Sequence, residues 1–305
     1  MPPDDPPKPR EAPRRQVGVW QAVAVCVGMV IGAGIFRSPS LVAANTGSDA
    51  AMMLAWAFGG AMSLAGALCY AEMAAAFPDA GGDYHFLTRA YGRRAGFLFA
   101  WSRFAVIHTG SMAMLAFVLG DYLGSMVPLG ALGSPVVAML AVIAIAAVNL
   151  AGLRAGLGTQ LALMGAVIAG LLSVGVAGIV LAVQGAAPLS ATPAAPSASH
   201  IGTALVFVFL AYGGWNDAAT LSAEMRDPQR GMTRALVAGM ALVTALYLVA
   251  NWAYGRGLGL AGIAASQAPA SDLVLIAFGP AGQAAIVAVV AVTAITSMNA
   301  ILIAG

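Results

Sequence analysis

The chain has 305 residues, of which 60% are hydrophobic and only 9% are charged, with 14 Lys and Arg against 12 Asp and Glu. A soluble domain carries about 25% charged residues. This composition therefore excludes an ordinary soluble enzyme, a secreted disulfide scaffold and a disordered chain. It predicts a protein that crosses a membrane several times. The net charge of +2 also argues against a nucleic-acid partner.

The N-terminal residues differ from the rest of the chain. Residues 1–16 contain six prolines and charges of both signs, which predicts a disordered cytoplasmic tail. No short apolar stretch with a small-residue cleavage site follows, so the tail is not predicted to be a signal peptide. Cys26 and Cys69 lie inside apolar runs, where buried thiols are favoured over a disulfide or a metal site.

A helix needs about 20 largely apolar residues to cross a bilayer, and the chain offers eight such stretches. Residues 255–280 are rich in Gly and Ala and contain Pro269 and Asp272, so we expect a long loop with short helical pieces there. The predicted fold class is an all-α polytopic membrane protein. The eight predicted spans are residues 17–44, 50–77, 94–123, 134–151, 156–184, 201–224, 232–254 and 281–305.

The cations predict the orientation of these spans. With the N-terminus in the cytoplasm, 11 Lys and Arg residues lie inside and only Arg37 and Arg256 lie outside, while Arg103 falls within the third span. Cytoplasmic loops carry an excess of Lys and Arg. We therefore expect a multi-pass protein of the cytoplasmic membrane with its N-terminus inside.

Two spans carry glycines where a helix should be most regular. The first reads VGMVIGAGIF over residues 27–36, and the sixth reads FLAYGGWND over residues 209–217. Glycine costs a helix about 1 kcal/mol relative to alanine. One explanation is close packing of helices through small residues. The favoured one is a pair of broken helices, five spans apart, as in inverted-repeat transporters with a midplane site.

Such breaks would create a binding site from the backbone. A half-helix that begins at a break exposes amides at its positive end, which suits an anion; these amides belong to Ala33, Gly34 and Ile35. The half-helices that end at the breaks expose carbonyl groups that suit a cation; these belong to Val30, Ile31, Leu210, Ala211 and Gly213. An anionic and a cationic group side by side match an α-amino acid zwitterion.

Four stretches in order carry a resemblance to a known family. They are GMVIGAGIFRSP (28–39), YAEMAAAFPDAGGDYHFLTRAYG (70–92), the segment from FLAYGGWND to MTRAL (209–236), and ITSMNAILIAG (295–305). The chain resembles the amino acid–polyamine–organocation superfamily, and within it the L-type amino acid transporter branch.

The resemblance implies a leucine-transporter-like inverted-repeat fold. Residues 17–184 would form the first five-helix repeat and residues 201–305 part of the second, with the chain truncated after the eighth of about twelve helices. By resemblance, the substrate carboxylate binds the first break, its amino group binds carbonyls at both breaks, and Asn216 lines the pocket. The expected substrate-binding residues are Val30, Ile31, Gly32, Ala33, Gly34, Ile35, Leu210, Ala211, Gly213, Gly214 and Asn216.

The chain departs from the family in several places. Ala33 replaces a common serine, and Leu210 replaces a common aromatic gate. Residues 155–185 contain no lysine, so the lysine that replaces a coupling sodium in some bacterial relatives is missing. Residues 124–134 contain no cysteine, so no disulfide-linked heavy chain is expected as a partner.

Ionisable residues within spans are costly and need an explanation. Asp217 is a candidate for proton coupling or amine binding, or else an acid that favours a helix N-terminus. Glu72 and Arg103 are candidates for a gating pair, or else reach to the interface separately. His108 is a candidate proton relay, although a neutral, hydrogen-bonded histidine is favoured.

The eighth predicted span has a polar patch. Ser297 is a candidate sodium ligand, and Asn299 is more simply explained by a hydrogen bond between helices. The sequence contains no Walker loop, nucleophile elbow or metal-ligand spacing. We therefore expect no enzyme, no metal and no cofactor.

The sequence predicts a secondary transporter of amino acids, with neutral L-amino acids as substrates and alternating access as the mechanism. Its partners would be the lipid bilayer and either a coupling proton or a counter-transported amino acid. Two alternatives remain: an amino acid sensor or assembly protein that does not transport, and a transporter of polyamines or other amines.

Overall fold

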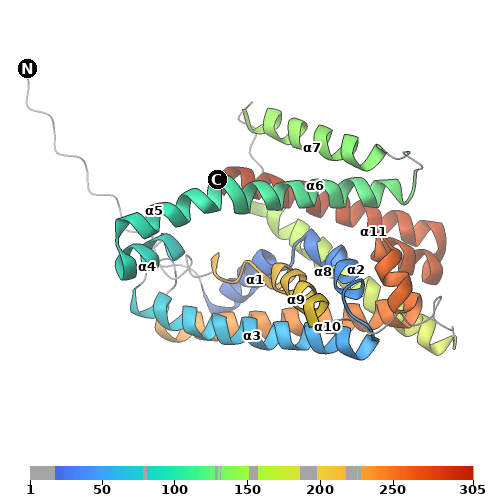
Figure 1. The fold of residues 1–305 in the computed structure, drawn as a ribbon, viewed down its shortest axis with the longest axis horizontal. Helices are drawn as coiled ribbons and strands as arrows, with labels where there is room; N and C mark the ends of the chain where they lie inside the picture. The colour runs from blue at the N-terminus through green and yellow to red at the C-terminus, as the bar shows by residue number, and fades with distance from the viewer. Residues whose placement is uncertain are drawn as a thin grey trace, which may run out of the picture.

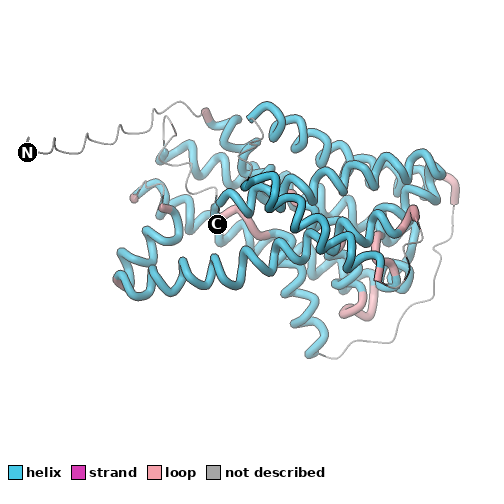
Figure 2. The backbone as a smooth tube through the Cα atoms, turned by 90° about the horizontal axis from the view of Figure 1, so that it is seen from above, coloured by secondary structure: helices cyan, strands magenta, loops and turns pink. Residues whose placement is uncertain are grey.

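The computed structural model describes residues 18–77, 81–127, 130, 132–150, 157–185, 198–217, 225 and 228–304. The predicted tail and residues 218–224 of the sixth span lie outside this part. The described elements are helices joined by loops (Figure 2). Their bounds are α1 Val19–Val30, η1 Ala33–Phe36, α2 Ser38–Ala43, α3 Asp49–Ala76, α4 Gly82–Tyr91, α5 Arg93–Ser102, η2 Arg103–His108, α6 Thr109–Gly124, α7 Gly133–Leu150, α8 Leu157–Val183, α9 Ala198–Tyr212, α10 Pro228–Ala265 and α11 Pro269–Ala304.

In the described part of the chain, six helices are long and apolar enough to cross a membrane. They contain Asp49–Ala76, Arg93–Gly124, Gly133–Leu150, Gly165–Val183, Gly231–Ala265 and Pro269–Leu302. The fold class of an all-α polytopic membrane protein is therefore confirmed. The apolar helices Val19–Val30 and His200–Tyr212 are too short to cross. They belong to the first and sixth spans, the two that the glycines predict to be broken.

The short helices lie at the centre of the arrangement (Figure 1). Long helices α3 and α10 pack along each other on one side, and α1 packs against α10. Helix α9 packs against α2 and α3, while α11 packs against α6 and α8. Helices α5, η2 and α6 follow one another as a continuous rod, with α7 on its outer side. The ends of α1 and α9 at the two breaks are buried, as Val30, Ala211 and Tyr212 show, although other side chains of α9 are exposed.

The predicted long loop at residues 255–280 is wrong in extent. The stretch is helical except around Ser266, where α10 ends and α11 begins three residues later at Pro269. Alanine favours helix, and proline is well placed in a first turn. The glycines mark changes of direction, since Gly259 (φ 66°) and Gly279 (φ 72°) adopt a left-handed backbone.

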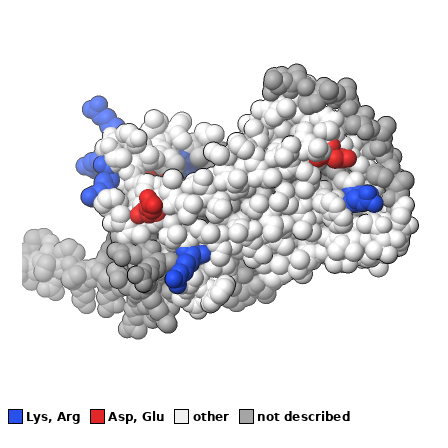
Figure 3. Space-filling model, turned by 90° about the horizontal axis from the view of Figure 1, so that it is seen from below, with Lys and Arg blue, Asp and Glu red and all other residues white. Residues whose placement is uncertain are grey.

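Charged side chains lie toward the two ends of the molecule, and a broad uncharged band separates them on the face shown in Figure 3. Both cysteines are free. Cys26 is buried as predicted, whereas Cys69 is exposed on α3, so the prediction of burial is wrong for Cys69. An apolar side chain exposed on a membrane-spanning helix faces no penalty from lipid, which explains why apolar context alone did not predict burial.

Candidate functional site

The first span is interrupted where the glycines predicted. Helix α1 ends at Val30, and the next two residues are extended: Ile31 has φ −78° and ψ 91°, and Gly32 has φ −109° and ψ −175°. The chain becomes helical again at Ala33. Close packing through small residues within a continuous helix is therefore excluded for this span.

The break leaves backbone amides without acceptors. Because η1 is a 3₁₀-helix with Gly32 at its N-cap, its first i→i−3 hydrogen bond comes from the Ile35 amide, and the amides of Ala33 and Gly34 have no acceptor within the helix. The amide of Gly32 instead donates to the carbonyl oxygen of Val30 at 3.0 Å. These two amides begin a helical segment that continues through η1 into α2. This arrangement favours an anion.

The sixth span ends its first half at the predicted glycines. Helix α9 stops at Tyr212, and residues 213–216 form turns. The amide of Gly213 donates to the carbonyl oxygen of Leu210 at 3.4 Å. Gly214 has φ +106°, a left-handed backbone that favours glycine. The predicted interruption of the helix is therefore confirmed between Tyr212 and Asp217. The second half of the span falls on residues that are not described.

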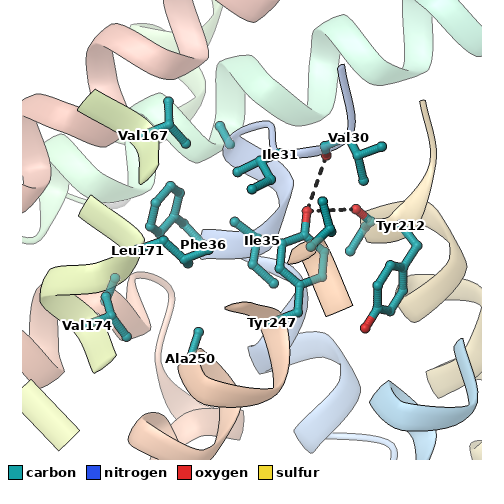
Figure 4. Close-up of a cluster of buried hydrophobic side chains, with 14 of the residues drawn as sticks. Val30, Ile31, Ile35, Phe36, Val167, Leu171, Val174, Tyr212, Tyr247 and Ala250 are labelled. Carbon is teal, nitrogen blue, oxygen red and sulfur yellow. Dashed lines mark hydrogen bonds between the residues drawn. The ribbon is translucent and has the colours of Figure 1, made fainter. Parts of the chain in front are cut away.

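The two breaks meet. The single hydrogen of the Tyr247 hydroxyl of α10 is shared between the carbonyl oxygens of Val30 (3.2 Å) and Ala211 (3.1 Å), as Figure 4 shows. Tyr247 is completely buried, and its ring packs against Tyr212 and Trp56. One side chain therefore connects the last carbonyl of α1 to a carbonyl near the end of α9.

Sequence reasoning missed Tyr247. A tyrosine within an apolar span carries a hydroxyl that needs a partner when it is buried. That signal was available, but several tyrosines shared it. Only the packing of α10 against α1 distinguishes Tyr247 from the others.

The polar residues of α11 lie near the first break. A Cβ added to Gly32 would lie 3.9 Å from the Ser297 hydroxyl oxygen, so this hydroxyl lines the break. The Asn299 side-chain oxygen accepts a 2.6 Å hydrogen bond from Asn149 of α7. This is the bond between helices that the sequence favoured for Asn299.

An ionic cluster lies beside the sixth-span break. Arg103 Nη2 contacts Asp217 Oδ1 at 2.7 Å, and Arg103 Nη1 lies 3.8 Å from Asp83 Oδ2. Asn216 donates to Asp83 Oδ2 at 2.8 Å. We refer to Arg103, Asp217, Asp83 and Asn216 as the Arg103 cluster. Its two carboxylates outnumber its one guanidinium.

The Arg103 cluster differs from the pairing considered from the sequence. Glu72 is exposed and Arg103 pairs with the two aspartates, so a Glu72–Arg103 pair is not formed. Asp83 was missed because it precedes the third span, in a segment read only as a cytoplasmic loop. The structure makes this segment the helix α4 and buries Asp83 in its first turn.

A π-helical turn completes the cluster. Residues Arg103–His108 form η2, in which side chains five residues apart lie one above the other. The Arg103 Nε atom donates to His108 Nε2 at 3.2 Å. A ring nitrogen that accepts carries no proton, so this contact corresponds to the neutral, hydrogen-bonded histidine that the sequence favoured.

Comparison with known proteins decides the family. The family model described as amino acid permease matches residues 17–305. The chain belongs to the amino acid permease family. The permease is 31% identical to Asc-type amino acid transporter 1 of Mus musculus over 256 residues, which cover 80% of the permease and 48% of the relative.

Two further relatives support the same branch. The permease is 32% identical to b(0,+)-type amino acid transporter 1 of Rattus norvegicus, over 79% of its own length and 51% of the relative. It is 30% identical to the serine/threonine exchanger SteT of Bacillus subtilis (strain 168), over 79% of its length and 54% of the relative. It thus spans about half the length of these relatives. The predicted superfamily branch is confirmed, and the relatives are transporters rather than enzymes.

In this permease, the structure brings the predicted residues into two groups. Residues of the two breaks surround Tyr247, with Ser297 at their edge. Asn216 and Asp217 turn instead toward Arg103, away from the carbonyls that Tyr247 holds. Asn299 bonds to α7, and Glu72 is exposed.

Proposed function

We propose that this permease is a secondary transporter that moves neutral L-amino acids across the cytoplasmic membrane by alternating access. The observation that carries the proposal is the meeting of two broken helices at one buried hydroxyl, that of Tyr247. The N-terminus would lie in the cytoplasm. Residues 17–184 would form one repeat and residues 201–305 part of an inverted second, each beginning with a broken helix.

The backbone of the first break would bind the substrate carboxylate. The free amides of Ala33 and Gly34 support this, whereas the amide of Gly32 already donates to Val30 and that of Ile35 belongs to the helical turn of η1. The substrate ammonium would bind the carbonyls of Val30, Leu210 and Gly213. Because the Val30 carbonyl oxygen already accepts from Gly32 and Tyr247, the ammonium would replace the Tyr247 hydroxyl there.

A neutral amino acid fits this site better than a polyamine. A polyamine needs several carboxylates, and the two that lie near the breaks, Asp83 and Asp217, share Arg103. Aliphatic side chains of the first break, such as Ile31 and Ile35, are buried beside the backbone site. We therefore rank polyamines below neutral amino acids as candidate substrates.

Two ionic contacts at opposite ends support alternating access. Asp121 follows Arg103 by 18 residues along the rod from α5 to α6, which is about 27 Å at 1.5 Å per residue. Arg103 pairs with Asp217 and Asp83, and Asp121 pairs with Arg37 at 3.7 Å. Contacts this far apart would serve as inner and outer gates that open in turn. A proton on the Arg103 cluster or a counter-transported amino acid would supply the coupling.

Uptake into liposomes tests the proposal. The purified protein is reconstituted, and accumulation of a panel of labelled amino acids is measured with an opposing pH gradient or with unlabelled amino acid preloaded inside. We expect saturable uptake of neutral amino acids under one of these conditions. Binding without uptake or exchange would favour the sensor alternative, and the absence of binding and flux for the whole panel would overturn the proposal.

A further inference from the structure

A cavity of about 430 Å³ lies next to the first break, at the end of the molecule opposite the Arg103 cluster. It is bordered by the start of α2, the last turns of α6, the start of α7 and the turn between α10 and α11. Ligand pockets for small molecules measure about 300–1,000 Å³. The residues of its wall that matter here are Arg37, Asp121, Ser134, Gln267, Met114 and Phe117.

Opposite charges face each other across the wall of this cavity. Arg37 Nε lies 3.7 Å from Asp121 Oδ2, which is too far for a hydrogen bond. The Arg37 guanidinium donates to the carbonyl oxygen of Ser266 at 3.1 Å and to the side-chain oxygen of Gln267. A guanidinium has five N–H donors, so three remain for a ligand.

Asp121 is also incompletely bonded. Its Oδ1 accepts a 2.7 Å hydrogen bond from the Ser134 hydroxyl, while Oδ2 has no hydrogen-bond donor among the described residues. The Arg37 and Asp121 side chains are only 18% and 17% exposed. Charged groups that are mostly buried gain from charge-assisted hydrogen bonds, and a zwitterion could supply one to each.

The remaining wall is apolar and reaches the first break. Met114 and Phe117 lie on α6 beside the charges. The Met114 Cε atom would lie 3.6 Å from a Cβ added to Gly34, so the same methionine contacts both the cavity and the proposed carboxylate site. Methionine is flexible and adapts to different shapes, which suits a wall between two binding sites.

We propose that this cavity is a second binding site for an α-amino acid, with Arg37 binding the carboxylate, Asp121 the ammonium, and Met114 and Phe117 the apolar side chain. The inference rests on the proposed function, because the cavity would hold the substrate on its way to or from the break between α1 and α9. It adds a site whose ligands are side chains, whereas those of the proposed central site are backbone groups.

Binding stoichiometry tests the second site. Binding of radiolabelled L-leucine to the purified full chain in detergent is measured by equilibrium dialysis up to millimolar concentration. We expect two molecules per chain in the unsubstituted protein and one in Arg37→Gln or Gly34→Val. The double variant should bind none. The control Arg256→Gln removes a cation of α10 that is not part of the cavity wall, and should still bind two.

A second variant distinguishes the loss of the cavity site from the loss of folded protein. Leu41→Trp fills the cavity from α2 without removing a charge, and should also leave one site. In Arg37→Gln and Leu41→Trp, the retained binding at the central site shows that the protein is folded. One site in the unsubstituted protein, lost in Gly34→Val and unaffected by Arg37→Gln and Leu41→Trp, would overturn the second site alone. The absence of binding in the unsubstituted protein, for L-leucine and for every other amino acid of the uptake panel, would overturn the proposed function as well.

Discussion

Gly214 approaches Met29 so closely that the two broken spans touch through their backbones. A Cβ added to Gly214 would lie 3.0 Å from the carbonyl carbon of Met29 and closer still to its oxygen. Real Cβ atoms do not come this near to a backbone group. The contact joins the last turn of α1 to the turn after α9, so the absence of a side chain at residue 214 sets the distance between the breaks.

This contact predicts different results at two adjacent glycines. Gly214→Ala should reduce the yield of folded protein and destabilise it by at least about 1–2 kcal/mol, the cost of a left-handed backbone for a residue with a Cβ, before the overlap with Met29 is added. Gly213→Ala is the matched control, because its Cβ would meet only the Leu210 oxygen at 3.3 Å and the Phe209 oxygen at 3.7 Å. Denaturation in mixed micelles measures both. Equal stability of the two variants would contradict the backbone contact.

Tyr247→Phe should destabilise the protein by about 1–3 kcal/mol, because it leaves the buried Val30 and Ala211 carbonyl oxygens without this donor. Tyr254→Phe is the matched control: Tyr254 is equally buried on α10, but its hydroxyl has no partner within the described residues. That substitution should be neutral or stabilising. The free energies of unfolding of the two variants are compared. A larger loss of stability for Tyr254→Phe than for Tyr247→Phe would contradict a stabilising role of the Tyr247 hydroxyl between Val30 and Ala211.

Arg103→Gln should destabilise the protein because it removes the guanidinium that pairs with Asp217 and Asp83. The loss should be about 1–3 kcal/mol, below that of a fully buried pair, since Asp217 is 40% exposed while Asp83 is only 7% exposed. Adding Asp83→Asn removes the more buried charge and should recover most of the loss. Unfolding of the single and double variants gives the coupling between them. Additive losses would show that Arg103 and Asp83 do not interact.

The bond between Asn149 and Asn299 predicts a small effect. Hydrogen bonds between membrane helices contribute on average about 0.6 kcal/mol. Asn299→Leu should therefore lower the stability by about that amount and leave amino acid uptake unchanged, since the Asn299 side chain bonds to α7 and not to a residue of either break. Uptake into liposomes and unfolding of the same preparation check both parts. A large loss of uptake with normal stability would instead place Asn299 in the transport path.

The spans were predictable because their signals are local. Continuous apolar runs predicted α3 and α7 to within one residue at each end, whereas α10 and α11 extend beyond their predicted spans into the expected loop. Glycines at the centre of two such runs predicted the interruptions at Gly32 and Gly214. The loop at residues 255–280 was overestimated because glycine marks a kink as readily as a loop.

The contacts of the candidate site were less predictable because they join distant segments. Nothing local distinguishes Tyr247 from other buried tyrosines, and its role depends on α10 packing against both breaks. Asp83 pairs with Arg103 only because α4 packs against α5 and brings Asp83 next to Asn216. Glu72 was an equally reasonable partner by sequence, but its side chain faces outward on α3.

The amides that follow the first break are the proposed binding site of the substrate carboxylate. Gly34→Val introduces a branched side chain beside them, and its Cβ would make only an ordinary contact with Met114, so the protein should still fold. Gly110→Val is the matched control on α6, where a Cβ would meet nothing within 4 Å. Isothermal titration of purified protein with a neutral L-amino acid that the unsubstituted protein binds measures the high-affinity site. We predict that this site is lost in Gly34→Val and retained in Gly110→Val; unchanged affinity in folded Gly34→Val would contradict the assignment of the carboxylate to these amides.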